Sequence, residues 1–395
     1  MSYPYSLPTT GSLSFKDFLE DTGSYSAEVT DATAQRGRVR IALKEFKKET
    51  PGSRDYRLIL NTIEDYLPYL VAVTNCLESG ELKLAKNIET SWRSTLSDHI
   101  IHTGSNAPRI VGADIHYELT FVLMTYAYAS SMYANDRLRT VQENSDTASN
   151  PYNKVADALN TAASIFHYIA NDVIPKWRPT SESRPIETIR ELPVALSKMA
   201  LADAQAVAIT KALSTGNLSK SLVAKLYIGI AGQYEMAHGL ISSMTATQEV
   251  SSDLKKYLLD GAQFYKAMAK KFLALDANDN QKLGDAVGFL RDSKADLRAI
   301  QHSSISKPHV RKSSVAARAV KEEEAVTELL QKFTMINDTI AYQAVPSRQE
   351  LQRLIPTGRG VLEMKRYTLP APAFGSSHED ATNASQSYAR SGAYY

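Results

Sequence analysis

Apolar residues recur every three or four positions along most of the chain, which is the period of an α-helix with one buried face. The predicted helices are separated by Asn, Ser, Asp, Gly or Pro residues, which cap or break helices. They span approximately residues 38–50, 55–77, 84–92, 115–138, 155–174, 186–213, 218–244, 254–275, 283–300 and 315–341. Strict alternation of apolar and polar residues, which is typical of half-buried strands, is nearly absent. The pattern therefore predicts an all-α protein.

Three segments refine this prediction. The helix at 115–138 is apolar nearly all round, as in helices buried inside a larger helical array. Residues 1–35 are rich in Ser, Thr, Tyr, Gly and Asp and are predicted as extended or loop segments, and Pro68 predicts a kink or break in the second helix. No repeat near 34 or 40 residues is found, so we expect an irregular array of antiparallel helical hairpins.

The chain changes character after Pro346. Residues 366–374 are extended and contain prolines, and Tyr367, Leu369 and Phe374 are apolar anchors that we expect to fold back onto the helices. Residues 375–395 read as a mobile tail. We therefore predict one helical domain at 1–365, followed by an extended segment and tail at 366–395.

Composition excludes several classes of protein. With 45 basic and 43 acidic residues the net charge is +2, far from the basic excess of a nucleic-acid-binding domain. The hydrophobic share of 43% is that of a globular protein, not of a disordered one. Cys76 is the one cysteine, which excludes an internal disulfide and favours a buried thiol. No apolar run or N-terminal signal predicts a membrane helix or secretion, so we expect a cytoplasmic protein.

No motif predicts catalysis. His99 and His102 form a possible metal pair without a third ligand. The acidic stretch from Asp276 lacks the glycine and glutamate of a calcium loop, and the segment 358–360 is too short for a phosphate cradle. We expect no metal, no cofactor and no enzymatic activity.

Two clusters of basic residues have two interpretations. They form either solvated helix faces and a loop, or a surface that attracts anionic lipid. The candidate residues are Arg36, Arg38, Arg40, Lys44, Lys47 and Lys48 in the first cluster, and Lys307, Arg311 and Lys312 in the second.

The helix at 218–244 carries the most informative pair. Leu222 and Leu226 are four residues apart and so share one face. Taken alone, this spacing favours one more buried stripe over a binding surface.

Four motifs, in consistent order, resemble the BRO-one domain of Alix-like scaffolds, over about residues 1–365. The first, Tyr117-Glu118 with Val122-Leu123-Met124, resembles a family helix, and residues 162–169 match the next one. The third pairs Ala202-Asp-Ala-Gln205 with Leu222-Val-Ala-Lys-Leu226, and the fourth is Asn337-Asp-x-Ile340-x-Tyr342 followed by Val345-Pro346. Residues 3–11 and 366–374 are similar to the branch of fungal pH-response regulators.

The resemblance implies a curved, boomerang-like domain that acts as a non-enzymatic adaptor. Its concave groove would bind the C-terminal amphipathic helix of the ESCRT-III core subunit, by helix-in-groove recognition. Leu222 and Leu226 match two anchor positions, and Ala208, with Ile209 beside it, stands at the aromatic third.

The same resemblance implies a role in fungal ambient alkaline-pH signalling, which leads to proteolytic activation of a transcription factor. The expected partners are ESCRT-III and other pH-signalling components, with possible peripheral contact to an anionic membrane and none to nucleic acid. The expected location is cytoplasmic, with recruitment to the plasma membrane or endosome. The alternative is a basic membrane-surface module in multivesicular-body trafficking without a pH-signalling role.

Overall fold

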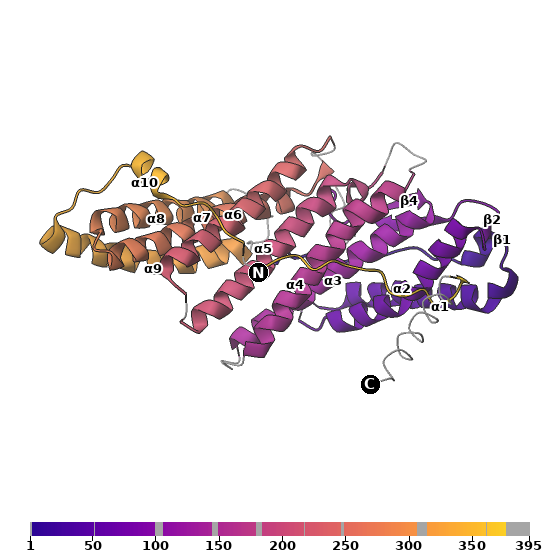
Figure 1. Ribbon diagram of the computed structural model, residues 1–395. Helices are drawn as coiled ribbons and strands as arrows, with labels where there is room; N and C mark the ends of the chain where they lie inside the picture. Colours follow the sequence, from indigo (N-terminus) through magenta and orange to yellow (C-terminus); the bar gives the residue numbers. More distant parts are fainter. Residues whose placement is uncertain are drawn as a thin grey trace, which may run out of the picture. The chain divides into compact units, whose positions relative to one another are not determined.

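The protein is built mainly of long α-helices (Figure 1). The computed structural model describes residues 2–376 apart from 51, 99–105, 144–148, 179–183, 217, 246–248, 306–313 and 361. The helices are α1 (Ser26–Lys48), α2 (Tyr56–Ser79), α3 (Ile115–Glu143), α4 (Ser149–Tyr168), α5 (Glu191–Ser214), α6 (Lys220–Ser242), α7 (Ser252–Asp279), α8 (Leu283–Ile305), α9 (Ser314–Ile336) and α10 (Arg348–Leu354). The predicted all-α class is thereby confirmed.

The chain packs as two compact units, each assembled from separate stretches of sequence. Unit 1 consists of Met1–Tyr3, Ala134–Ala163 and Ala195–Met364. Unit 2 consists of Pro4–Tyr133, Ser164–Val194 and Lys365–Tyr395.

In unit 2, α1 packs against α2. The Asp55 carboxylate caps the start of α2 by accepting hydrogen bonds from the backbone N–H groups of Arg57 and Leu58. Gly80 ends the helix in the left-handed conformation, with a φ of 81°. The helix runs on through Pro68, so the predicted break does not occur there.

The predicted helix at 84–92 is wrong, because this stretch forms strands. Strand β2 (Lys83–Leu84) pairs with β1 (Leu19–Asp21), and β3 (Glu89–Arg93) pairs antiparallel with β4 (Arg109–Ala113). Leu84, Ile88 and Trp92 are spaced four apart, which places them on one side of a helix and equally on one side of a strand. Residues 1–35 agree with the prediction in strand β1, which is extended, but differ from it at Ser26, where α1 begins.

A fully buried carboxylate, Glu118 on α3, joins four segments of unit 2. The Arg36 Nε atom on α1 lies 3.1 Å from it, and the Trp92 indole N–H on β3 donates to it over 2.7 Å. Tyr66 on α2 donates over 3.4 Å. Arg36 also bonds the N-terminal segment, through its contacts to Gly11 O and Thr10 Oγ1. A single buried ion pair therefore orients the elements around it.

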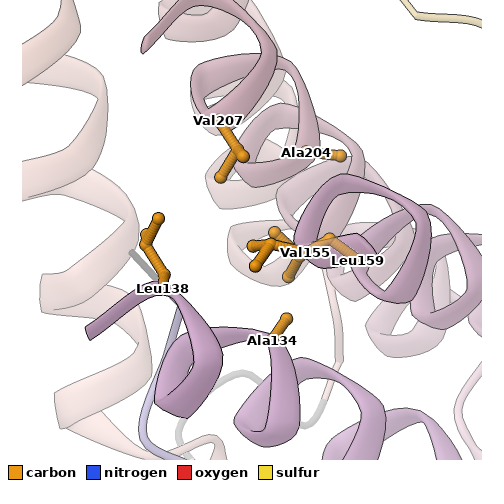
Figure 2. Packing of buried hydrophobic residues seen from close by; sticks show 6 residues of the cluster. All are labelled: Ala134, Leu138, Val155, Leu159, Ala204 and Val207. Atoms are coloured by element: carbon orange, nitrogen blue, oxygen red, sulfur yellow. The ribbon is translucent and has the colours of Figure 1, made fainter. Parts of the chain in front are cut away.

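In unit 1, α6 packs on α7, α7 on α8 and α8 on α9, so these long helices lie side by side (Figure 1). A further apolar cluster joins α3, α4 and α5 (Figure 2). Its buried members are Ala134, Leu138, Val155, Leu159, Ala204 and Val207. Leu362, from the segment after α10, packs against this cluster.

From the sequence we expected no segment that could cross a membrane. By length and composition alone, however, helix α5 is long and apolar enough to do so. In the structure 78% of that apolar stretch is buried, as expected of a core helix.

The segment after α10 folds back along the helices as an extended strap, defined here as residues 356–376, which confirms the prediction for Tyr367 and Phe374. In unit 2 the Tyr367 ring packs edge-on against Tyr168, with centroids 5.4 Å apart. The backbone N–H of Ala373 donates to Pro68 O over 3.0 Å, and buried Phe374 packs on Tyr25.

Candidate partner-binding site

The first turns of α6 carry the two leucines that the sequence singled out. Ser219 caps the helix by accepting a hydrogen bond from the Leu222 backbone N–H over 3.3 Å. Leu222 is half-buried and reaches the surface, whereas Leu226 is only 5% exposed. On α5, Ala208 is half-buried and Ile209 is 1% exposed. Of these four side chains, Leu222 and Ala208 therefore reach the surface, whereas Leu226 and Ile209 are buried.

Contacts on the inner face of α6 explain why Leu226 is buried. Tyr227, directly after it, stacks on Tyr265 of α7 with ring centroids 5.9 Å apart, and it also packs on Phe272. These rings fix the rotation of α6 about its axis. Leu222 and Leu226 consequently lie on the flank of the helix rather than on its exposed back.

The same flank continues into a large cleft. Positions 222, 226, 229 and 233 follow at helical spacing along one side of α6. Gly229 and Gln233 line a cleft of about 1480 Å³, together with Gln205 from α5 and side chains of α7, α8 and α10. The apolar pair thus leads along α6 into a concave surface within unit 1.

The strap crosses α6 at this point. The Arg359 backbone N–H donates to Lys225 O over 3.0 Å. A Cβ atom on Gly229 would collide with the Arg359 carbonyl, and one on Gly358 would collide with the Gly229 backbone. Gly229 and Gly358 therefore permit a close backbone crossing, a role that their sequence context does not reveal.

Charges around the cleft are largely paired with one another. Lys270 of α7 lies 2.7 Å from Asp296 of α8, and Lys256 lies 2.8 Å from Asp260. Lys266 pairs with Glu235 across α7 and α6. The result is a mixed polar rim next to an apolar entrance, which suits an amphipathic partner better than a highly charged one.

Behind α6 lies a buried aspartate. Asp203 on α5 is 1% exposed and accepts a hydrogen bond from the Tyr234 hydroxyl over 2.6 Å. Burial raises the pKa of Asp203 to about 7. Nearby, Arg318 of α9 donates to the Tyr265 hydroxyl over 3.3 Å. The Tyr234–Asp203 hydrogen bond fastens α5 to α6 away from solvent.

Only part of the first basic cluster is exposed. Arg36 is 2% exposed and paired with Glu118, so its assignment to a membrane-facing surface is wrong. Arg38 and Lys48 are exposed on α1, and Arg40, Lys44 and Lys47 are half-buried. Lys47 donates to Asn106 and Lys48 to Glu45. Lys307, Arg311 and Lys312 lie outside the described residues, as do His99 and His102.

Within the described part of the chain, no group of three His, Cys, Asp or Glu side chains is placed to hold a metal ion. Cys76 is a free, buried thiol, as the sequence predicts.

Comparisons with known proteins place this architecture among described ones. Residues 12–363 match the BRO1-like domain family. The chain is 27% identical to the pH-response regulator protein palC of Cryptococcus neoformans var. neoformans serotype D (strain B-3501A), over 97% of this chain and 95% of that protein. It is 26% identical to palC of Emericella nidulans, over 94% of this chain and 90% of that protein.

Solved structures show the same fold. An ALIX BRO1–CHMP4C complex superposes with a TM-score of 0.68 at 17% identity, covering 96% of this chain and 99% of that one. The structure described as the basis for endosomal targeting by the Bro1 domain gives a TM-score of 0.64 at 15% identity, covering 99% and 98%.

Proposed function

This chain belongs to the BRO1-like domain family, and from that premise we propose that it is a non-enzymatic adaptor that binds an ESCRT-III subunit. The partner segment is the C-terminal amphipathic helix of the ESCRT-III core subunit, by analogy with the ALIX BRO1–CHMP4C complex. The observation that carries this proposal is the apolar flank of α6, where Leu222 reaches the surface and the helix continues into the cleft.

We propose pH-response signalling as the pathway in which the adaptor acts. Support comes from the palC relatives, which align with 94% or more of this chain and at least 90% of their own length. The proposed output is proteolytic activation of a transcription factor. We propose recruitment of the protein to the periphery of the plasma membrane or endosome, through its ESCRT-III partner.

In this interpretation Leu222 is the surface anchor. One apolar face of the partner helix packs on Leu222 and Ala208, and Leu226 and Ile209 keep the floor beneath them apolar. Because alanine stands where an aromatic anchor is expected, less apolar area is buried at that end. We therefore expect weaker binding than an aromatic anchor would give.

The test measures binding of a labelled peptide, the C-terminal helix of an ESCRT-III core subunit, to the purified full chain by fluorescence polarisation. Leu222→Asp places a charge against the apolar face of the partner helix. We expect it to weaken binding about tenfold or more, which corresponds to roughly 1.4 kcal/mol or more. Leu226→Asp tests the floor of the site, with its folding checked by thermal melting because this position is buried.

The matched control is Met236→Asp, which adds the same charge to an exposed position of α6 about 21 Å further along the helix. This variant is expected to bind as the native chain does. Absence of binding by the native chain would refute the proposal. A folded Leu222→Asp variant that binds with native affinity would show that the site is misplaced.

A further inference from the structure

The C-terminal end of the strap is held by one exposed carboxylate. Glu81, just after α2, accepts a hydrogen bond from the Ser376 hydroxyl over 2.6 Å and one from the Ser376 backbone N–H over 3.1 Å. Tyr25 donates to the same carboxylate over 2.8 Å, and so does Ser79. These bonds hold the pKa of Glu81 well below its ordinary value, at about 2, so the group is charged at neutral pH.

This contact closes over the thiol of Cys76. Gly375, directly before Ser376, has a φ of 97° and packs so closely on the Cys76 sulfur that a Cβ atom would collide with it. Phe374 is buried against Tyr25. Cys76 is 1% exposed, although Glu81 and Ser376 beside it are exposed. The end of the strap therefore covers the one thiol of the chain.

We propose that Ser376 is a phosphorylation site of a serine kinase that recognises acidic residues after its target, and that the phosphate releases the end of the strap from Glu81. In the sequence, Glu379 and Asp380 stand three and four positions after Ser376, the pattern that acidic-directed kinases recognise. Ser376 is exposed, and its hydroxyl is the group that fastens the strap.

The chemistry is a phosphoryl transfer from ATP. The Ser376 Oγ atom bonds to the γ-phosphorus while the bond from that phosphorus to the β,γ-bridging oxygen breaks, and ADP leaves. The hydroxyl proton passes to the catalytic base of the kinase. Phosphorylation thereby replaces the Ser376 hydroxyl, which donated a hydrogen bond to Glu81, with a phosphate. The phosphate carries about two negative charges and lacks the hydroxyl proton.

The consequence follows from charge. A phosphate facing the Glu81 carboxylate repels it where the hydroxyl attracted it, so the closed state of the strap end loses population. Tyr367 and Ala373 hold the strap further back, through Tyr168 and Pro68. Release is therefore confined to the end that covers Cys76.

Cys76 supplies the readout, because it is the one cysteine of the chain. The full chain is incubated with a casein kinase 2-type enzyme and ATP, and peptide mapping locates the phosphate. We expect phosphate on Ser376, and a labelling rate of Cys76 by a thiol reagent that rises about threefold to tenfold. Phosphate on Ser377 alone, or an unchanged labelling rate after modification of Ser376, would overturn the proposal.

Variants separate charge from the mere loss of a hydrogen bond. Ser376→Asp should expose Cys76 more than Ser376→Ala does, and 1 M salt should shrink that difference. In a Glu81→Gln background the two variants should label alike, because the repelling charge is gone. Thr368→Asp, which adds the same charge to an exposed strap position away from Glu81, should leave labelling at the native rate. An excess for Ser376→Asp that persists in the Glu81→Gln background would refute the charge mechanism.

Discussion

Glu118 in unit 2 and Asp203 in unit 1 are both carboxylates withdrawn from solvent, but their surroundings differ. Glu118 contacts the guanidinium of Arg36 at 3.1 Å and the indole N–H of Trp92 at 2.7 Å. Asp203 accepts its hydrogen bond from the uncharged hydroxyl of Tyr234, and burial raises its pKa to about 7. The Glu118 network thus contains a full ion pair, whereas the Asp203 carboxyl group accepts from an uncharged donor and titrates near neutrality. The raised pKa of Asp203 makes the stability of its network depend on pH near neutrality.

The largest expected effect comes from removing the cation in unit 2. Arg36→Met leaves Glu118 buried without its counter-charge, which costs about 3–5 kcal/mol of unfolding free energy. Urea unfolding followed by circular dichroism measures it. Arg38→Met, at an exposed position of the same helix, should change stability by less than about 0.5 kcal/mol. The double variant Arg36→Met/Glu118→Gln should recover much of the loss, and equal destabilisation of the single and double variants would contradict an uncompensated charge.

The second-largest expected effect is the pH dependence of stability that Asp203 causes. The folded-state pKa of Asp203 is raised, so the unfolded chain releases this proton first as pH rises. The group therefore lowers stability progressively between about pH 4 and pH 7. Asp203→Asn removes this titration. The difference in unfolding free energy between the variant and the native chain should grow by about 1–3 kcal/mol from pH 5 to pH 8, in favour of the variant.

Urea unfolding of both proteins at the two pH values gives this difference directly. Asp338→Asn, at an exposed position of the same unit, supplies the baseline and should show no comparable gain. A variant that stays parallel to the native chain across the pH range would mean that Asp203 is ionised throughout.

The smallest effect isolates the hydrogen bond itself. Tyr234→Phe keeps the ring that packs on Tyr257 and Tyr265 but removes the donor to Asp203. The expected cost is about 0.5–1.5 kcal/mol, and it should be larger at pH 8, where the acceptor is charged, than at pH 5. Thermal unfolding at both pH values measures it, and a larger cost at pH 5 would reverse the assignment of charge.

Sequence patterns predicted the long helices because their apolar stripes are local. The pattern around Arg36 also contained a signal for its burial, since Arg36 lies three residues before Val39 and seven before Leu43, on the core stripe. Its basic neighbours concealed that position. The identity of its partner had no local signal, because Glu118 is 82 residues away in the sequence.

The candidate site was predictable in part. The spacing of Leu222 and Leu226 identified a shared face, but not that Leu226 would be nearly buried beneath it. That burial depends on Tyr265 and Phe272 of α7, which set the rotation of α6. The strap crossing at Gly229 could not be predicted from the sequence either. A glycine permits a close approach of another segment but does not indicate which segment approaches.

The strap has a consequence for how the protein is made. Unit 2 contains both Pro4 and the strap end at Ser376, so its first and last pieces leave the ribosome far apart in time. At about 5–20 residues per second, roughly twenty seconds to more than a minute separate them. During that interval nascent unit 2 lacks the cover over Cys76, and its thiol is open to oxidants and chaperones alike. A stretch synthesised long after Pro4 is therefore the one that covers the Cys76 thiol in unit 2.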